Sequence, residues 1–422
     1  MPDKAIIILG AGPQQIPAIT RAHDLGYAVI SPDMDAAAPG LPLSDYPLPG
    51  VSTHDSGPII EAALRLRQAG RSVDGVLAMA VEAAGSAARV CEALGLPTVG
   101  SVAADLATDK LARLKAWRQA GVSCPRFGQA DDAEEAVAVA KDIGLPVVLK
   151  PLKRAGARGV VRCDTLEQVH DVFDIAGRES ETTVLIEEFI EGTEHSSESL
   201  VVDGEIHTLG FSDRNYDTKY KYPPHLLENG DTCPTALPRA TYENVLTEVE
   251  KAIRALGIGF GPAKGDILVS REGRVYMLEM AARLSGDYFC SFTAPLNNGS
   301  DIVSAAIQQA VGDPVTPEFV RWHYDRGVAL RYFWPEPLPG RIKAVSGWDE
   351  AHALPGVHFI TWEPYWAKQD IGVGTLVHPP TSHGERVGCV MATADTRDAA
   401  VELAERVVGM VRIEIEPQTS GS

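Results

Sequence analysis

Residues 145–194 most restrict what this chain can fold into, because two buried strands in this stretch end on polar groups of opposite charge. The first apolar run, residues 145–149, ends on Lys150, and a basic loop that contains glycine, residues 153–159, follows it. The second apolar run continues into the acidic segment 187–194. Main-chain amides of such a loop approach phosphate oxygens closely, and lysine or arginine supplies the opposite charge. The stretch therefore predicts a pocket for a phosphorylated ligand.

The acidic segment carries the groups that a purine nucleoside needs. Adenine requires apolar faces, main-chain polar groups for its edge and a carboxylate for its exocyclic amine, and ribose hydroxyls donate to a further carboxylate. Glu187 is the candidate partner of the amine, and Glu194, expected on the turn beyond the strand, is the candidate partner of the ribose. An ordinary solvated loop after a buried strand explains the basic loop equally well, because a lone glycine-containing loop is weak evidence.

Two further carboxylates are expected to lie side by side on a hairpin. A turn at Gly273 places Asp266 opposite Glu279 on the neighbouring strand. Side chains opposite each other on antiparallel strands lie about 5 Å apart, so the two carboxylates repel. A magnesium ion shared with triphosphate oxygens relieves the repulsion, because hard cations take a few carboxylates together with phosphates. The alternative is a surface salt-bridge cluster in which Lys264 or Arg283 pairs with the acids.

Residues 1–105 alternate apolar runs with amphipathic segments, which is typical of an open α/β domain. The glycine-rich turn after the first strand is followed about twenty residues on by Asp33, so a dinucleotide site is one interpretation. That interpretation is disfavoured because Gln15 stands at the third glycine position. Pro13 also removes an amide from the turn that would hold the pyrophosphate.

The remaining chain is predicted from its apolar periodicity. Residues 102–120 predict one helix with Lys110 early in it, and such a lysine is ordinarily a surface residue. The order of helices and strands from 131 to 186 describes a small α+β lid, and lids over phosphates exclude water and move. The segment 213–238 is long, polar and aromatic, and connections of that length are usually functional or disordered. The last hundred residues show short β runs without a chemical motif.

Length and charge limit the class of protein. A chain of 422 residues is long enough for two or three domains. The net charge of −19, from 38 basic and 57 acidic residues, argues against a nucleic-acid or anionic-membrane partner. Six widely separated cysteines indicate neither a zinc site nor a disulfide framework, and no apolar run approaches twenty residues, so a cytoplasmic location is expected.

The chain resembles the ATP-grasp superfamily over nearly its whole length. The resemblance is carried by the order of five features: Lys110, Lys150, the basic loop, the acidic segment and the carboxylate hairpin. The resemblance is greatest to the branch of L-amino acid ligases, purine-pathway carboxylases and biotin carboxylases. It implies a combination of α/β and α+β structure in three parts. These are a Rossmann-like domain at 1–105, an ATP-grasp domain at 106–320 with its lid near 122–188, and a β-rich cap at 321–422.

The resemblance also implies roles for individual residues. ATP and Mg²⁺, or Mn²⁺ in its place, are the implied cofactors, with Asp266 and Glu279 as metal ligands. Lys150 and Arg283 are the implied catalytic residues, and Arg283 would face the γ-phosphate. The implied ATP-binding residues are Lys110, Lys150, Arg158, Glu187, Glu188, Phe189, Ile190, Glu194 and Leu278. The candidate substrate-binding residues are Arg283, Ser285, Gly286 and His195.

Three positions depart from the superfamily's usual pattern. Ala281 stands where many relatives have asparagine, as in some purine-pathway relatives. Lys264 and Asp266 stand where histidine and glutamate are common, and the basic loop has Ala155 and Ala157 in place of glycine or small polar residues. The first departure predicts that one metal ion keeps an additional water ligand.

The expected activity is an ATP-dependent carboxylate–amine ligase that works through an acyl-phosphate and releases ADP and phosphate, with small-molecule carboxylate and amine substrates. The nearest alternative uses the same groups to carboxylate a substrate with bicarbonate through carboxyphosphate. Two others are a nicotinamide oxidoreductase built on the first βαβ unit and a nucleotide-binding regulatory module without turnover. Relatives commonly pair, so a homodimer is also expected.

Overall fold

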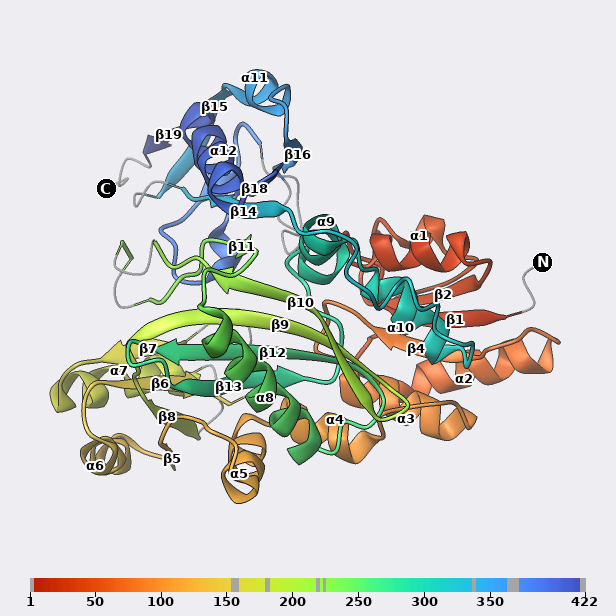
Figure 1. The fold of residues 1–422 in the computed structure, drawn as a ribbon, viewed down its shortest axis with the longest axis horizontal. Helices are drawn as coiled ribbons and strands as arrows, with labels where there is room; N and C mark the ends of the chain where they lie inside the picture. The colour runs from red at the N-terminus through yellow and green to blue at the C-terminus, as the bar shows by residue number, and fades with distance from the viewer. Residues whose placement is uncertain are drawn as a thin grey trace, which may run out of the picture.

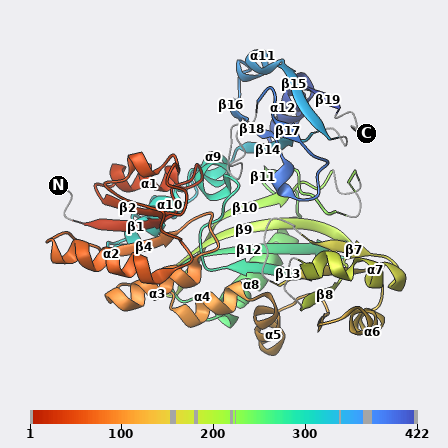
Figure 2. The same cartoon turned by 180° about the vertical axis from the view of Figure 1, so that it is seen from behind.

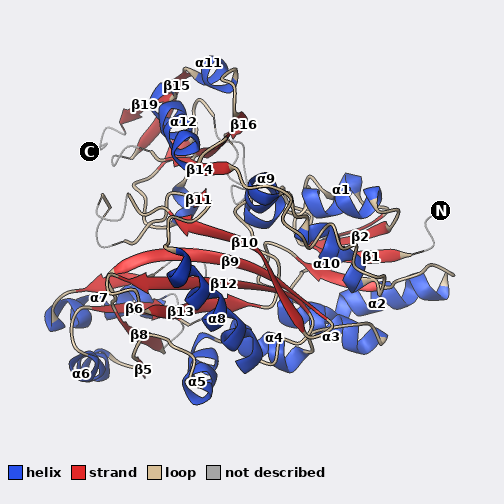
Figure 3. Cartoon of the chain, in the orientation of Figure 1, coloured by secondary structure: helices blue, strands red, loops and turns tan. Residues whose placement is uncertain are grey.

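The computed structural model describes residues 4–152, 159–178, 183–217, 221–222, 225–335, 339–362 and 372–417, with the main chain alone for 174–178 and 384. These residues form four sheets with helices packed on them (Figures 1 and 3). The predicted combination of α/β and α+β structure is therefore confirmed. Within the described residues, no helix is both long and apolar enough to cross a lipid bilayer.

The N-terminal sheet is parallel and has the strand order β3-β2-β1-β4. Its edge strand β3 was not predicted, because two of its four residues are proline, which removes amide donors and is tolerated at a sheet edge. The strands are β1 (Ala5–Leu9), β2 (Ala28–Asp33), β3 (Tyr46–Pro49) and β4 (Gly75–Ala78), and the helices are α1 (Ile16–Asp24), η1 (Leu41–Leu43), α2 (Ser56–Gln68) and α3 (Ala84–Leu94).

Asp33 holds the glycine-rich turn closed. One of its carboxylate oxygens accepts the Ala11 amide at 2.8 Å, and the other accepts the Asp35 amide at 2.8 Å. The acid that suggested a dinucleotide ribose therefore has a structural task within its own domain.

The single helix predicted over residues 102–120 is wrong, because the chain breaks at Asp109. Helix α4 (Ser101–Thr108) ends there, and Asp109 has the extended conformation. Its carboxylate then caps α5 (Lys110–Ala120) by accepting the Ala112 amide at 2.9 Å. The break puts Lys110 on the first turn of a new helix.

The predicted lid is an antiparallel sheet with the order β5-β8-β6-β7. Helices α6 and α7 pack on it over a core of small and β-branched side chains. The elements are β5 (Phe127–Ala130), α6 (Ala133–Ile143), β6 (Val147–Pro151), β7 (Val161–Cys163), α7 (Leu166–Arg178) and β8 (Val184–Glu188). Most of the basic loop, including Arg158, lies outside the described residues.

The central sheet has the order β13-β12-β9-β10-β11-β14-β18-β16 and crosses the predicted boundary between the second and third parts. Thr232 of β11 pairs with Ala329 of β14, so the cap shares main-chain hydrogen bonds with the central strands. The domain limits themselves stay predictions. The strands are β9 (Gly192–Val202), β10 (Glu205–Arg214), β11 (Asp231–Cys233), β12 (Gly261–Ser270), β13 (Val275–Ala281), β14 (Gly327–Phe333), β16 (Val357–Thr361) and β18 (Gly388–Ala394).

The N-terminal part and the lid lie at opposite ends of the long strands β9, β10 and β12, and the C-terminal part continues the sheet beyond β11 through β14, β18 and β16 (Figures 1 and 2). A three-stranded sheet in the order β17-β15-β19 completes the C-terminal part. The remaining elements are α8 (Arg239–Ala255), η2 (Phe289–Thr293), α9 (Ala294–Asn298), α10 (Ile302–Ala310), β15 (Gly340–Ser346), α11 (Trp348–His352), β17 (Leu376–Val377), η3 (His383–Glu385), α12 (Arg397–Met410) and β19 (Arg412–Pro417).

Strand β9 begins at Gly192, earlier than the predicted start at Ser196, because β12 pairs with it from Ser270 onward. Glu194 therefore lies within a strand, and the expectation that it sits on a turn is wrong. Side chains alternate between the faces of a strand, so Glu194 shares a face with Ser196, and His195 points to the other.

Glu198 is a carboxylic acid buried in the same strand. Its side chain is fully inaccessible and accepts the Ser285 amide at 3.2 and 3.3 Å. Burial raises the pKa of Glu198 to about 7, although the Ser285 hydrogen bond and Arg283 act in the opposite direction. Folding therefore favours the protonated acid near neutral pH.

We predict that Glu198 makes the protein less stable as the pH rises. The unfolded chain releases this proton near pH 4.5 and the folded protein near pH 7, so stability is lost across that window. Glu198→Gln, which stays neutral, should match wild type at pH 4.5 and exceed it at pH 8 by at most about 3 kcal/mol. Thermal midpoints at both pH values measure this, with exposed Glu250→Gln as control. A constant difference at both pH values would contradict the prediction.

Candidate active site

A cavity of about 470 Å³ lies between the lid, the central sheet and the N-terminal part. It gathers most of the candidate residues from segments far apart in the chain. The predicted residues that line it are Lys110, Lys150, Glu187, Glu188, Phe189, Ile190, Glu194, Asp266, Leu278, Glu279, Arg283, Ser285 and Gly286. The functions assigned to these residues stay predictions, and their placement in one cavity is what the structure adds.

Two lysines face the lid side of the cavity. Lys150 on β6 forms an ion pair with Glu187 on β8. Burial disfavours the charge of Lys150, but Glu187 more than offsets this and raises its pKa. Lys110 donates to the Pro151 carbonyl at 2.9 Å, and its pKa is lowered by burial against the attraction of Glu279. Both amines thus lie where they would meet an anionic ligand.

The carboxylates of the hairpin lie opposite each other, as predicted, with Asp266 in register with Glu279. Asp266 accepts the Ser196 hydroxyl at 3.0 Å and forms ion pairs with Lys264 and, at 3.3 Å, with Arg214. Burial opposes its charge, but these two cations dominate and lower the pKa of Asp266. The acid is therefore an anion across the physiological pH range.

The donor set fits a magnesium ion that completes its shell with phosphate. Among the described residues, no cluster of three or more His, Cys, Asp or Glu side chains is arranged to hold a metal. Mg²⁺ is commonly bound by one or two carboxylates together with substrate phosphates and water. Asp266 and Glu279 supply that number, and the pKa of Glu279 is lowered, despite burial, by Arg113 and Lys110.

The alternative salt-bridge cluster is present only in part. Lys264 pairs with Asp266, whereas Arg283 pairs with Glu82 from the N-terminal part. Arg283 also donates to the Leu284 carbonyl at 3.0 Å, and it lines the cavity. Arg283 is therefore held by residues other than the two hairpin acids.

The acidic segment borders the cavity with mixed polar and apolar groups. Glu188 turns its carboxylate to Arg126 at 3.1 Å, and Phe189 packs under the Arg162 guanidinium at 4.1 Å from the ring centre. Glu194 accepts the Tyr216 hydroxyl at 2.8 Å. Glu187 lines the cavity and pairs with Lys150, and its proposed contact with an adenine amine stays a prediction.

His195 was a candidate for shaping the substrate pocket, and it is not among the residues that line this cavity. Its ring is buried on the far face of β9, where it bonds Thr193 at 2.8 Å and Asp213 at 2.8 Å. It also stacks on Phe211 with ring centres 5.4 Å apart. The strand alternation that points Glu194 into the cavity points its neighbour away from it.

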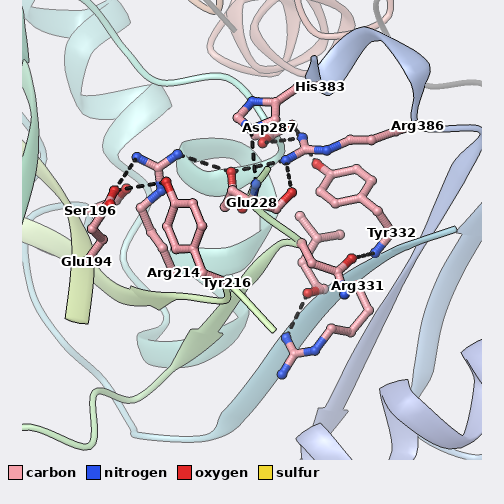
Figure 4. Close-up of polar contacts among 12 residues, drawn as sticks. Glu194, Ser196, Arg214, Tyr216, Glu228, Asp287, Arg331, Tyr332, His383 and Arg386 are labelled. Atoms are coloured by element: carbon pink, nitrogen blue, oxygen red, sulfur yellow. Dashed lines mark hydrogen bonds and ion pairs between the residues drawn. The ribbon is translucent and has the colours of Figure 1, made fainter. Parts of the chain in front are cut away.

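Several charged residues of the site were not predicted. Arg214 at the end of β10 bridges Asp266 and Glu228. Glu228 also accepts from Arg386 at 3.1 Å (Figure 4). The length of segment 213–238 was the one signal, since it indicated function without naming residues. The sequence assigned no role to the lining residues Glu82, Arg113, Arg214, Tyr216, Glu228, Asp231, Asp287 and His383, and it offered Lys264 only as a salt-bridge partner of the hairpin acids.

The loop after β13 carries unusual backbone at the cavity wall. Asp287 and Tyr288 have φ values of 58° and 62°, a region that residues other than glycine rarely adopt. Such conformations persist only where the surroundings hold them, and they gather at functional sites. Arg386 holds the Asp287 carboxylate at 3.1 Å.

Comparison with known proteins agrees with this geometry. Residues 109–317 match the family described as carbamoyl-phosphate synthase L chain, ATP binding domain, and residues 331–416 match L-amino acid ligase C-terminal domain 2. A D-alanine–D-alanine ligase from Azoarcus sp. (strain BH72) is 32% identical over 193 residues, which are 45% of this chain and 62% of that protein. The chain thus spans about three fifths of that relative's length.

Two crystal structures share the fold. An L-amino acid ligase from Bacillus licheniformis superimposes with a TM-score of 0.81 and 20% identity, covering 99% of this chain and 100% of that one. The biotin carboxylase domain dimer of Hydrogenobacter thermophilus 2-oxoglutarate carboxylase, in complex with MgADP, ADP and bicarbonate, gives 0.71 and 18%, covering 97% and 90%. With the two family matches and the converging lysines and carboxylates, these similarities show that the chain belongs to the ATP-grasp superfamily.

Proposed function

We propose that this protein is an ATP-dependent ligase that joins a small carboxylic acid or amino acid to an amine and releases ADP and phosphate. The observation that carries the proposal is the single cavity that Lys110 and Lys150 line together with Asp266 and Glu279. The match of residues 331–416 to an L-amino acid ligase domain favours an amino acid as the acid. A homodimer is also proposed, because a structural relative forms one.

The reaction proceeds in two displacements. A carboxylate oxygen attacks the γ-phosphorus, the bond to the β,γ-bridging oxygen breaks, and ADP leaves. The amine nitrogen then attacks the carbonyl carbon of the acyl-phosphate, the bond from that carbon to the phosphate oxygen breaks, and the nitrogen loses a proton. Phosphorylation supplies the leaving group that a carboxylate lacks in water at neutral pH.

The protein contributes position and charge in this scheme. Lys150 and Lys110 would neutralise phosphate oxygens from the lid side. Arg283, held by Glu82, would face the γ-phosphate and the carboxylate that attacks it. Ser285 and Gly286 would border the acid, since they line the same wall as Arg283.

Asp266 and Glu279 would hold Mg²⁺. When bound, the ion would neutralise the charge that develops on the phosphate oxygens during phosphoryl transfer. Lys264, now paired with Asp266, would exchange that contact for the ligand. Arg214 keeps one side of Asp266 neutralised throughout.

The second candidate is a carboxylase that activates bicarbonate in place of an organic acid. Ala281 favours it, because some purine-pathway relatives carry alanine there, and Ala281 lines the cavity. Only the second substrate differs, so one assay separates the two activities.

We predict that ADP release in the presence of Mg²⁺ depends on an amino acid rather than on bicarbonate. In a coupled assay, each amino acid is offered alone, so that it serves as both acid and amine. The rate of ADP release should then exceed the rate measured with bicarbonate and the corresponding amine that has no carboxylate. Stimulation by bicarbonate alone would favour the carboxylase, and ATP left intact under every condition would contradict both.

We predict that Glu279→Gln and Asp266→Asn each lower turnover by about 100-fold or more, because each removes a metal ligand. Glu272→Gln, on the turn of the same hairpin, is the matched control and should leave turnover unchanged. Steady-state ADP release across Mg²⁺ concentrations measures the effect. Wild-type rates in both hairpin variants at limiting Mg²⁺ would show that the metal site is misplaced.

We predict that Lys150 contributes to stability and catalysis separately. Lys150→Met leaves Glu187 buried without its cation, which should destabilise the lid by about 3–5 kcal/mol as well as slow turnover. Adding Glu187→Gln should restore the thermal midpoint but not the rate. Exposed Lys115→Met is the control. Recovery of ADP release in the double variant would show that Lys150 is structural only.

A further inference from the structure

One end of the cavity is acidic and lies toward the C-terminal part. Glu228, Asp231 and Asp287 line it, beside His383. Glu228 is paired with Arg214 at 3.1 Å on one side and with Arg386 at 3.1 Å on the other (Figure 4).

Asp287 is also already paired. Arg386 approaches its carboxylate at 3.1 Å, and the Tyr332 hydroxyl donates to it. The Arg386 guanidinium lies 3.7 Å from the centre of the Tyr332 ring, which fixes the cation in place. Glu228 and Asp287 therefore have their countercharge without any ligand.

Asp231 differs from both of these acids. Its side chain is only 7% exposed, and within the described part of the chain its Oδ1 atom has no hydrogen-bond partner and its carboxylate has no ion pair. The nearby Arg331 guanidinium donates instead to the Asp231 main-chain carbonyl at 3.0 Å and to Thr232 Oγ1 at 3.2 Å. Asp231 thus lines the cavity from a short strand with a carboxylate that forms no ion pair among the described residues, although the charges of Arg331 and Arg214 act on it.

The surroundings make this carboxylate costly unless a cation joins it. Burial first, and then the charges of Glu228 and Asp287, raise the pKa of Asp231 well above its ordinary value. The ring of His383 supplies no charge, because burial and Arg386 hold its pKa far below the usual range and its Nε2 accepts the Glu228 amide at 3.2 Å. A buried anion of this kind is stable only when it is paired or protonated.

We infer that Asp231 selects a substrate with a cationic side chain, an ammonium or guanidinium group, so that the acid or amine joined by this enzyme is a basic amino acid. The inference rests on the proposed ligase activity and adds the substrate class. A charge-assisted hydrogen bond from such a group would give the Asp231 carboxylate the ion pair that it lacks among the described residues.

The position of Asp231 favours the side-chain cation over the α-ammonium. The Arg214 guanidinium separates Asp266, at 3.3 Å, from Glu228, at 3.1 Å. Asp231 lies on β11, three strand positions from Asp266 in the order β12-β9-β10-β11, and neighbouring strands lie about 4.8 Å apart. A carboxyl group reacting near Asp266 is therefore farther from Asp231 than one α-carbon can span.

The test compares lysine with norleucine, which lacks only the side-chain ammonium, each offered alone to the full-length protein with MgATP. Lysine should give a kcat/KM for ADP release about tenfold or more above norleucine. Asp231→Asn should lower kcat/KM for lysine and abolish that preference. Asp203→Asn, which removes an exposed carboxylate at the β9–β10 turn, is the control and should keep the preference.

Two results would overturn the inference: equal rates with lysine and norleucine in wild type, or an unchanged lysine preference in Asp231→Asn. The wild-type ratio does not depend on any variant folding. Absence of ADP release with every amino acid would instead reject the ligase proposal. In that case, the role of Asp231 is tested by calorimetry with lysine and with norleucine, at saturating Mg²⁺ and a non-hydrolysable ATP analogue. If lysine binds no more tightly than norleucine, the role of Asp231 is rejected.

Discussion

The structure depends on keeping many buried charges of both signs neutral around one cavity. Asp266 is the centre of this arrangement, because it accepts from Ser196 and pairs with Lys264 and Arg214. Ser196 lies on β9, Arg214 on β10 and Lys264 on β12, so the geometry of the sheet fixes which groups neutralise Asp266. Isolated buried ions cost more than folding supplies, and the pairing of these groups is therefore what allows a charged cavity to exist in the apolar middle of the protein.

Strand pairing decides which of these side chains reach the cavity. Strand β9 pairs with β12 from Gly192, the first residue of β9, and Glu194 and Ser196 both fall on the cavity face. The register also sets Asp266 opposite Glu279 across the next pair of strands. One continuous ladder thus aligns residues that the proposed mechanism assigns to ribose and metal, and a shift by one residue would turn all of them to the opposite face.

Prediction from the sequence succeeded where a local pattern carried the information. The apolar runs ending at Lys150 and the hairpin turn at Gly273 specified both a strand and the polar group at its end. The break at Asp109 was missed, because a capping aspartate inside a long apolar pattern looks like an exposed helical residue. His195 was misplaced for a related reason: the strand start was set too late, and facing cannot be assigned outside a strand.

The charged residues of the acidic end could not have been predicted, since their partners are distant in the chain. Arg386 lies 158 positions from Glu228, and no periodicity relates them. Their meeting follows from the pairing of β11 with β14, which joins the cap to the central sheet and brings residues of the two matched families into one wall. The groups proposed to face phosphate and metal lie on α5, on the lid and on or just after the central strands, whereas Asp231, the group proposed to choose the substrate, lies on β11, which pairs with the first strand of the cap.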